Sequence, residues 1–245
     1  MGYHDVIGQE AEKMLEFVET GTTHSATDTM EVPATVYTDP AYFEREKAEI
    51  FMKLPLLAAL TAEMPNLGDY KAMELLGKPV LITRKSDGTV AAMLNVCTHR
   101  GMILKPEGHG NAKRFSCPYH AWTYSNDGKL IGVAEPQKFG PICKEERNLT
   151  ALPVAEAGGI IWICLTPGLE FDIAAHLGGM LDDLNAYGLG DWHYCGSRRI
   201  YGPNWKIAYD GYLEGYHFAA AHPTTIHPRT FSNIMHFTAF GPHMR

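Results

Sequence analysis

Two short segments, CTHRGM at residues 97–102 and CPYHAWTY at residues 117–124, decide how this sequence is interpreted. Each segment offers one thiol and one imidazole. Two loops that face each other would bring together two sulfurs and two nitrogens. A [2Fe–2S] cluster with two cysteines on one iron and two histidines on the other requires this set of ligands. The candidate cluster ligands are therefore Cys97, His99, Cys117 and His120.

Two alternatives stay open for these four residues. Unrelated buried side chains would give the same letters, although two pairs of ligands with matching loop residues rarely coincide. A structural zinc site is the sharper alternative, because two sulfurs and two nitrogens suit tetrahedral zinc. Zinc fingers more often keep both cysteines in one pair, so the mixed pairs favour the cluster. We interpret the other cysteines as small core residues: Cys143, Cys164 and Cys195.

The two segments lie within a stretch that carries strand signals. Apolar runs flank polar turns at residues 86–88 and 125–128, which predicts two hairpins. The β-branched run at 159–165 predicts a buried strand. Residues 78–165 are therefore expected to form a small all-β module. Outside it we expect helices at 9–18, 40–53 (capped by Thr38-Asp39), 171–187 and 205–221, and a strand at 198–201.

A second group of candidate residues lies in a helical pattern that begins at Asn204-Trp205-Lys206. At about 100° per residue, a continuous helix would place Asp210, Glu214 and His217 on one face. Buried carboxylates without partners are costly, and a metal ion would offset that cost. The sequence therefore predicts a metal site on this helix face.

Two histidines and one carboxylate form the facial triad of non-haem Fe(II) oxygenases, which leaves positions for O₂ and substrate. Pro223 disfavours helical backbone at His222, so a helix that ends just before His222 would let it turn back toward His217. An amphipathic helix with solvated acids and one core histidine is the alternative. His227 is a further candidate ligand, but the Pro228 that follows it indicates a loop.

Together the two groups resemble the α subunits of Rieske-type ring-hydroxylating oxygenases. The paired loops look like that family's Rieske motif, and E-x-x-H-x₄-H at residues 214–222 looks like its mononuclear-iron helix. The resemblance implies an α+β protein, with an all-β Rieske module packed on part of a helix-grip catalytic domain. The implied domains are a helical segment at 1–50, the Rieske [2Fe–2S] domain at 51–165, and the N-terminal part of the catalytic domain at 166–245.

The resemblance also implies a role for each candidate residue. Cys97 and Cys117 would hold one iron of the cluster, and His99 and His120 the other. His217 and His222 would hold the mononuclear Fe(II). Glu214 falls where the family has a bridging carboxylate, usually Asp, that links a cluster histidine of a neighbouring subunit to an iron-bound histidine. Asp210 falls near a position beside the iron ligands, and with Glu214 it completes the set of candidate catalytic residues.

Three departures from the family pattern stand out. Ala121 replaces the usual Gly after the second cluster histidine. Family members with Glu in place of Asp at position 214 include enzymes that act on quaternary amines. The third iron ligand of the family is a downstream Asp, whereas no Asp or Glu follows His222 in this sequence. We therefore expect the sequence to be a piece of a longer chain, without much of the catalytic sheet.

The implied protein is a terminal oxygenase component. It would receive NAD(P)H electrons from a reductase, directly or through a ferredoxin, and hydroxylate or dihydroxylate an aromatic substrate with O₂. Oxidative demethylation of a quaternary amine, or of another N- or O-alkyl substrate, is the alternative. A Rieske electron carrier is a further alternative, but it would not need residues 166–245. The implied assembly is a homotrimer, with or without a β subunit.

Composition limits the partners and the location. The 245 residues are 45% apolar and 20% charged, as in ordinary soluble proteins. A formal charge of −7 argues against nucleic acid and anionic membranes as partners. Five cysteines do not suggest a disulfide scaffold. The N-terminus lacks the basic and apolar regions of a secretory signal, so we expect a cytoplasmic protein in a reducing compartment.

Overall fold

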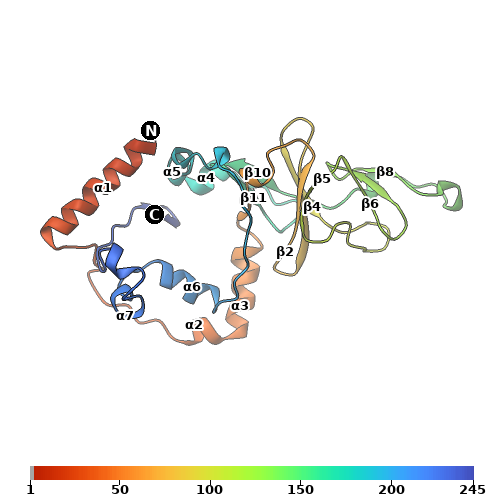
Figure 1. The fold of residues 1–245 in the computed structure, drawn as a ribbon. Coiled ribbons are helices and arrows are strands. Elements are labelled where there is room, and N and C mark those ends of the chain that lie inside the picture. The colour runs from red at the N-terminus through yellow and green to blue at the C-terminus, as the bar shows by residue number, and fades with distance from the viewer. Residues whose placement is uncertain (1–2) are drawn as a thin grey trace. The chain divides into compact units, whose positions relative to one another are not determined.

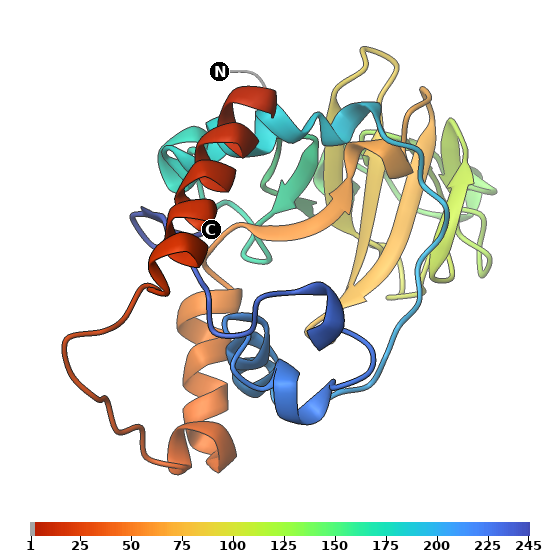
Figure 2. The ribbon, with the colours of Figure 1, turned by 60° about the vertical axis from the view of Figure 1, so that its left-hand side comes forward.

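The computed structural model describes residues 3–245 (Figures 1 and 2). Met1 and Gly2, on which part of the signal-sequence prediction rests, lie outside these residues. The chain divides into two compact units. Unit 1 comprises Met1–Arg45, Leu177–Tyr187 and Cys195–Arg245, and unit 2 comprises Glu46–His176 and Gly188–Tyr194. Across the described residues, no helix combines the length and the apolar character needed to cross a membrane.

Unit 2 consists mainly of antiparallel strands in three sheets. The five-stranded sheet has the order β5-β2-β3-β4-β9, with β2 Asp69–Leu75, β3 Lys78–Arg84, β4 Val90–Leu94, β5 Gly108–Asn111 and β9 Ala151–Leu152. The other two sheets are β1-β11-β10 (Leu56–Leu60, Ile160–Ile163, Val154–Ala157) and β6-β7-β8 (Arg114–Ser116, Thr123–Ser125, Leu130–Gly132). Both predicted hairpins and the predicted buried strand are confirmed, and the hairpin turns join β3 to β4 and β7 to β8.

Short helical turns complete unit 2. They are η1 Lys47–Phe51, η2 Thr61–Glu63, η3 Pro136–Lys138, η4 Glu145–Arg147 and η5 Leu189–Asp191. Helix α4, Ile173–Leu177, crosses the boundary between the units. Antiparallel sheets together with helices make this an α+β protein, as predicted.

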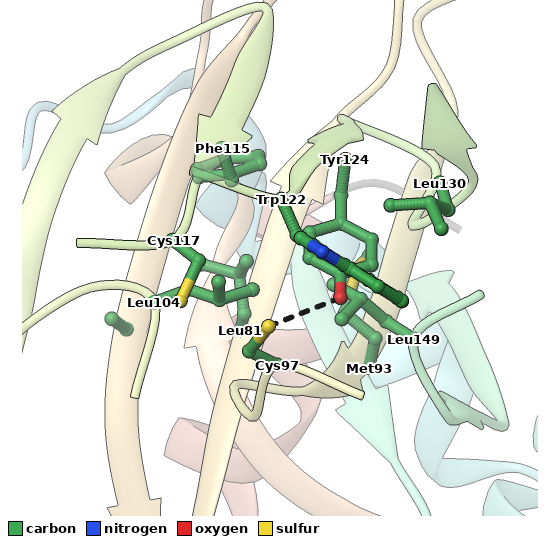
Figure 3. Close-up of a cluster of buried hydrophobic side chains, with 11 residues drawn as sticks. Leu81, Met93, Cys97, Leu104, Phe115, Cys117, Trp122, Tyr124, Leu130 and Leu149 are labelled. Carbon is green, nitrogen blue, oxygen red and sulfur yellow. Dashed lines mark hydrogen bonds between the residues drawn. The ribbon is translucent and has the colours of Figure 1, made fainter. Parts of the chain in front are cut away.

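Strand β3 is buried on both faces, and it supplies side chains to two cores. Successive side chains of a strand point to opposite faces. Val80 and Ile82 therefore pack with the β1-β11-β10 sheet. Leu81 points the other way, into a core with the β6-β7-β8 sheet that also holds both candidate cysteines: Leu81, Met93, Cys97, Leu104, Phe115, Cys117, Trp122, Tyr124, Leu130 and Leu149. The candidate cluster loops are thus anchored in a hydrophobic core (Figure 3).

Unit 1 is mainly helical. Its elements are α1 Tyr3–Thr20, α2 Thr35–Thr38, α3 Pro40–Glu46 (which ends at the boundary), α5 Met180–Tyr187, α6 Trp205–Tyr212, α7 Phe218–Ala221, η6 His227–Arg229, and the hairpin of β12 Ala239–Phe240 with β13 His243–Met244. The predicted cap before Pro40 is confirmed, because the Asp39 carboxylate accepts a hydrogen bond from the Ala41 N–H at 2.8 Å.

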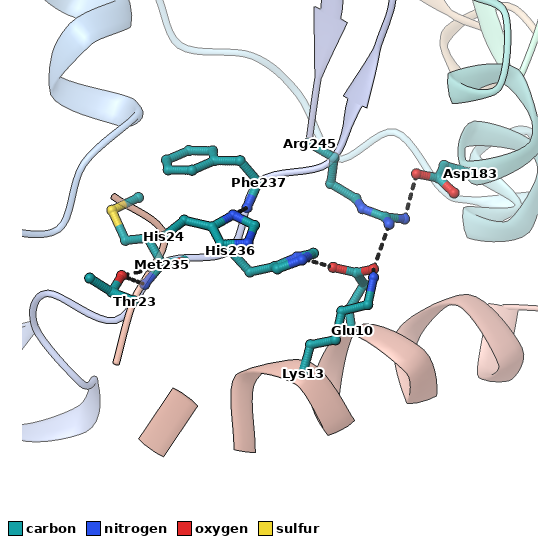
Figure 4. Close-up of polar contacts among 9 residues, drawn as sticks. All are labelled: Glu10, Lys13, Thr23, His24, Asp183, Met235, His236, Phe237 and Arg245. Carbon is teal, nitrogen blue, oxygen red and sulfur yellow. Dashed lines mark hydrogen bonds and ion pairs between the residues drawn. The ribbon is translucent and has the colours of Figure 1, made fainter. Parts of the chain in front are cut away.

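A polar network connects three segments of unit 1 (Figure 4). The Arg245 guanidinium donates to Glu10 of α1 at 2.7 Å and to Asp183 of α5 at 2.5 Å. His236 Nδ1 lies 2.7 Å from the other Glu10 oxygen. Burial by itself would raise the pKa of Glu10, but the Arg245 charge and the His236 hydrogen bond hold that pKa below its ordinary value of 4.5.

Four predictions about the fold are wrong. The helix predicted at 171–187 is two helices, α4 and α5, which are separated at Gly178 and Gly179. Residues 198–201 lie in irregular structure, because Ile200 and Tyr201 are exposed and bury no apolar face that would hold them against a sheet. The helix predicted at 205–221 is interrupted at 213–217, where Gly215 adds an entropic cost of about 0.5–1 kcal/mol relative to Ala. Of the cysteines assigned to the core, only Cys164 is buried, whereas Cys143 and Cys195 are exposed.

Candidate cluster and iron sites

Two loops of unit 2 carry the candidate cluster ligands, and they share one backbone design. In the first loop the Cys97 N–H donates to the Met102 carbonyl at 2.8 Å, and the Gly101 N–H donates to the Cys97 carbonyl at 2.9 Å. The second loop repeats both bonds at the same distances, with Cys117 in place of Cys97 and Ala121 in place of Gly101. Gly101 and Ala121 both have positive φ angles, +74° and +54°. Each loop is therefore closed by the same pair of hydrogen bonds.

The loops place both predicted cysteines in one hydrophobic core and bring the two predicted histidines side by side. Cys97 and Cys117 are both buried, and the ring centroids of His99 and His120 are 4.8 Å apart. Nδ1 of each ring is buried and has no hydrogen-bond partner. An unpaired buried nitrogen costs about 1–3 kcal/mol, and bonding to a metal would remove that cost. Two buried thiols and two unpaired imidazole nitrogens fit a [2Fe–2S] cluster with mixed ligands.

Aromatic packing fixes the His99 ring. The Trp122 ring stacks on it, with centroids 4.7 Å apart and planes 7° from parallel. Burial lowers the pKa of His99, and the nearby charges of His120 and Arg100 lower it further. The neutral imidazole is the form that binds metals. The surroundings of His99 therefore favour the form that a metal site needs.

Tyr124 is a part of this site to which the sequence analysis assigned no role. Its hydroxyl oxygen lies 3.2 Å from Cys97 Sγ and accepts a hydrogen bond from the Thr98 N–H at 3.1 Å. Burial raises the pKa of Tyr124 to about 12, so the hydroxyl keeps its proton near neutral pH. A signal existed in the sequence: Tyr124 ends the run at 121–124 that flanks the polar turn at 125–128 and predicts a strand.

The candidate iron ligands lie in unit 1, after helix α6. His217 Nδ1 lies 2.5 Å from Glu214 Oε1, and the His217 N–H donates to Glu214 Oε2 at 3.1 Å. The hydrogen bond from His217 lowers the pKa of Glu214. His222 leaves the helical region at φ −126° and ψ 47°, as predicted from Pro223. Its ring centroid lies 5.4 Å from that of His217.

Asp210 does not share a helix face with Glu214 and His217, so that prediction is wrong. Helix α6 ends at Tyr212, and the chain has left the helix before it reaches Glu214. The Asp210 carboxylate instead accepts a hydrogen bond from the Tyr37 hydroxyl at 2.8 Å. The surroundings of Asp210 are therefore set by the segment around α2.

A pocket of about 360 Å³ lies beside Glu214 in unit 1. Three aromatic residues line it together with Glu214: Tyr212, Phe218 and Phe231. Aromatic faces next to a carboxylate attract organic cations. The rival ligand His227 does not line this pocket, and its Nδ1 lies 2.8 Å from the Ser232 hydroxyl.

Within residues 3–245, no three His, Cys, Asp or Glu side chains gather as a site for a single metal ion. A cluster does not require such a group, because each of its irons takes two protein ligands and the sulfides complete the coordination. For a mononuclear iron, His217 and His222 supply two nitrogens, and both rings are half-buried.

Two family profiles match the chain. Residues 55–152 match the Rieske [2Fe-2S] domain, and residues 187–245 match the ring hydroxylating alpha subunit (catalytic domain). The chain belongs to the family of Rieske-type ring-hydroxylating oxygenase α subunits. Membership in this family implies a [2Fe–2S] cluster and a mononuclear iron.

Relatives of known function include both dioxygenases and monooxygenases. The anthranilate 1,2-dioxygenase large subunit of Acinetobacter baylyi is 29% identical over 82% of this chain and 43% of its own length. The carnitine monooxygenase oxygenase subunit of Escherichia coli K12 is 32% identical over 78% of this chain and 52% of its own length. The chain thus spans about half the length of these relatives.

Solved structures give the same two groups. The quaternary ammonium Rieske monooxygenase CntA in complex with L-carnitine has a TM-score of 0.77 and 30% identity, and the match covers 84% of this chain and 59% of that one. Naphthalene 1,2-dioxygenase from Rhodococcus sp. has a TM-score of 0.71 and 28% identity, with coverage of 88% and 49%. The comparisons therefore give the family, and they leave the substrate class open.

Proposed function

We propose that this chain is part of the terminal oxygenase component of a Rieske non-haem iron oxygenase. The observation that carries the proposal is the pair of buried, unpaired Nδ1 atoms of His99 and His120, on the same two loops as the buried thiols of Cys97 and Cys117. These four residues would bind the cluster, and His217 and His222 would bind the mononuclear iron. The cluster supplies one-electron transfer, and the mononuclear iron supplies O₂ activation.

Glu214 has a positioning role in this proposal. It holds His217 through Nδ1, which leaves Nε2 of the same ring to face the metal. A carboxylate behind a metal-bound histidine fixes the orientation of the ring and raises its basicity. Asp210 would have an indirect positioning role, because its carboxylate accepts the hydrogen bond that joins helix α6 to Tyr37 of α2.

Two substrate classes have support. Hydroxylation of an aromatic substrate agrees with the relative that acts on anthranilate. Oxidative demethylation of a quaternary amine is the second candidate, and a specific observation favours it: the pocket beside Glu214 is lined by three aromatic rings. Such rings attract a quaternary ammonium group by cation–π interaction, worth about 0.5–2 kcal/mol.

Electrons would come from NAD(P)H through a reductase, with or without a ferredoxin. A homotrimer is the proposed assembly, with or without a β subunit. Support comes from the structure of a related quaternary ammonium Rieske monooxygenase, which was described in terms of inter-subunit electron transfer. A cytoplasmic location would suit the thiol ligands, because a reducing compartment keeps cysteines out of disulfides.

Metal and sulfide analysis of the purified protein tests the proposal. The protein should be red-brown, contain acid-labile sulfide, and give a reduced-state EPR signal typical of mixed Cys and His ligation. A colourless protein with one zinc per chain would refute the cluster assignment. Product analysis with reductase and O₂ then separates the substrate classes: formaldehyde from a quaternary amine supports demethylation, whereas a cis-dihydrodiol or phenol supports aromatic hydroxylation.

A further inference from the structure

The Tyr124 hydroxyl lies at the centre of a hydrogen-bond network in the first cluster loop. Its oxygen is 3.2 Å from Cys97 Sγ and 3.0 Å from Thr98 Oγ1. The Thr98 N–H donates to the same oxygen at 3.1 Å. Figure 3 shows the hydroxyl turned toward the Cys97 sulfur. Tyr124 is fully buried, whereas Thr98 is half-buried.

A count of protons gives the direction of each bond. A cysteine bound to iron is a thiolate without a proton, so Cys97 can only accept. The Thr98 hydroxyl gives its own proton to the Arg147 carbonyl at 2.7 Å. Tyr124 therefore has one hydroxyl proton and two acceptors within reach, Cys97 Sγ and Thr98 Oγ1. A stronger bond to one acceptor means a weaker bond to the other.

We infer that Thr98 tunes the reduction potential of the cluster by competing with Cys97 for the Tyr124 proton. The inference rests on the proposed function, in which Cys97 binds the cluster. Reduction adds one negative charge, so a hydrogen bond to a ligand sulfur stabilises the reduced cluster more and raises the potential. Thr98 holds part of the Tyr124 proton and keeps the potential lower than Tyr124 alone would set it.

Arg147 is the residue that makes Thr98 an acceptor. Its carbonyl takes the Thr98 proton and so orients the Thr98 oxygen toward Tyr124. Arg147 ends the short helix η4, 49 residues further along the chain. The segment around η4 thereby acts on Cys97 through Thr98 and Tyr124. Thr98 is a positioning residue, and its effect is expected in the potential rather than in cluster content.

Redox titration of the cluster-loaded full chain, followed by visible circular dichroism, tests the inference. Tyr124→Phe should lower the potential by about 59 mV, a tenfold change in the ratio of reduced to oxidised cluster for one electron. Thr98→Val keeps the side-chain shape and loses the acceptor, so it should shift the potential in the opposite direction by a smaller amount. Thr98→Ser keeps a hydroxyl and should remain near the wild-type value.

Two further variants separate this competition from a general structural effect. The double variant Tyr124→Phe/Thr98→Val should have the potential of Tyr124→Phe alone, because Thr98 acts only through the Tyr124 proton. Thr83→Val is the matched control. It removes a buried threonine hydroxyl that also donates to a backbone carbonyl, that of Asn126 at 2.5 Å. Its potential should equal that of the wild-type protein.

A Thr98→Val protein whose potential is unchanged or lower would overturn the inference. So would a Thr98→Val effect that persists in the Tyr124→Phe background. If Thr98→Val fails to load the cluster, Thr98→Ala removes the same hydroxyl with less bulk and gives the same test. A wild-type protein without any cluster refutes the proposed function as well, whereas a loaded cluster with an unmoved potential refutes only the competition at Thr98.

Discussion

The two candidate metal sites differ in how deeply the side chains around them are buried. The cluster loops of unit 2 are anchored in a core whose side chains are almost completely removed from solvent. Among the described residues, Val6 and Leu177 are the only buried apolar side chains of unit 1. Near the candidate iron ligands, Tyr212 is 89% and Tyr216 is 77% exposed. The candidate cluster loops are therefore positioned by packing, whereas within the described residues a local hydrogen bond links Glu214 and His217 of the candidate iron site.

The largest expected effects come from removing one ligand at each site. Cys117→Ser should abolish the cluster and its visible absorption, because a serine oxygen is a poor substitute for a soft thiolate. His222→Ala should lower the content of mononuclear iron and leave the cluster spectrum intact, because the two ligand sets lie in separate elements. Absorption spectra and the ratio of iron to sulfide measure both outcomes. A His222→Ala protein without visible bands would contradict the prediction that the cluster is retained when the mononuclear iron is lost.

Glu214→Gln should separate metal binding from electron transfer. The amide keeps the shape of the side chain but removes the charge that holds His217 Nδ1. Changes behind a metal ligand typically cost about 10–100-fold in activity. We expect such a decrease in single-turnover oxidation of the reduced cluster with substrate and O₂, with both metals at full occupancy. A wild-type rate would mean that Glu214 is only a solvated acid.

A matched pair of phenylalanines tests the difference in packing. Phe115 is fully buried in the cluster core of unit 2, whereas Phe231 of unit 1 is 67% exposed. Phe115→Ala should lower the free energy of unfolding by about 3–5 kcal/mol. Phe231→Ala should change it by about 0.5 kcal/mol or less. Urea unfolding followed by fluorescence gives both values, and equal losses would contradict the contrast between the units.

The cluster loops could be predicted from sequence because their structure is local. Each loop closes on itself within six residues, as in the hydrogen bond from Cys97 to Met102. The polar turns at 86–88 and 125–128 likewise specify hairpins through their own residues. The contact between Tyr124 and Cys97 could not be predicted in this way, since it joins residues 27 positions apart through the pairing of β7.

The iron site shows where the helical pattern was misleading. The helix from Trp205 to Ala221 was predicted from the spacing of apolar residues. This spacing does not reveal side-chain hydrogen bonds that compete with the backbone bonds of a helix. Glu214 accepts from the His217 N–H and pairs with its ring, which offers the chain an alternative to the helix at that point. The exit of His222 from the helix was predictable, because Pro223 restricts the preceding backbone directly.

Each unit contains a partly buried glutamate whose pKa is lowered, Glu63 in unit 2 and Glu10 in unit 1. Burial by itself would raise the pKa of Glu63 and of Glu10, but Lys71 in unit 2 and Arg245 in unit 1 hold these pKa values below 4.5. A carboxyl with a lowered folded-state pKa contributes stability above its unfolded value, and the contribution is lost as the pH falls through the folded value. Both units should therefore lose stability below about pH 4.5.

The loss should be larger in unit 2, because the Glu63 side chain is 8% exposed and that of Glu10 is 21% exposed. Glu63→Gln should cost about 1.5–3 kcal/mol at pH 7 and flatten the acid dependence. Glu10→Gln is the matched variant and should cost less. Urea unfolding at pH 3, 5 and 7 measures the difference. A larger effect at Glu10 would contradict the expected order.

The smallest expected effect is a change in stability when the residue with positive φ is exchanged between Ala and Gly in each of the two cluster loops. Ala121 holds a φ of +54°, where the equivalent Gly101 has +74°. A side chain in this region costs about 1–2 kcal/mol, whereas glycine adds about 0.5–1 kcal/mol of unfolded-chain entropy. Ala121→Gly should therefore stabilise the cluster-loaded protein by about 0.5 kcal/mol. Gly101→Ala is the reciprocal test: its new Cβ would meet no atom within 4 Å, so a loss of about 0.5 kcal/mol would come from the backbone alone. If Ala121→Gly destabilised the protein in urea unfolding, the second loop would need its methyl group for packing, and the two loops would be alike in hydrogen bonding but not in energy.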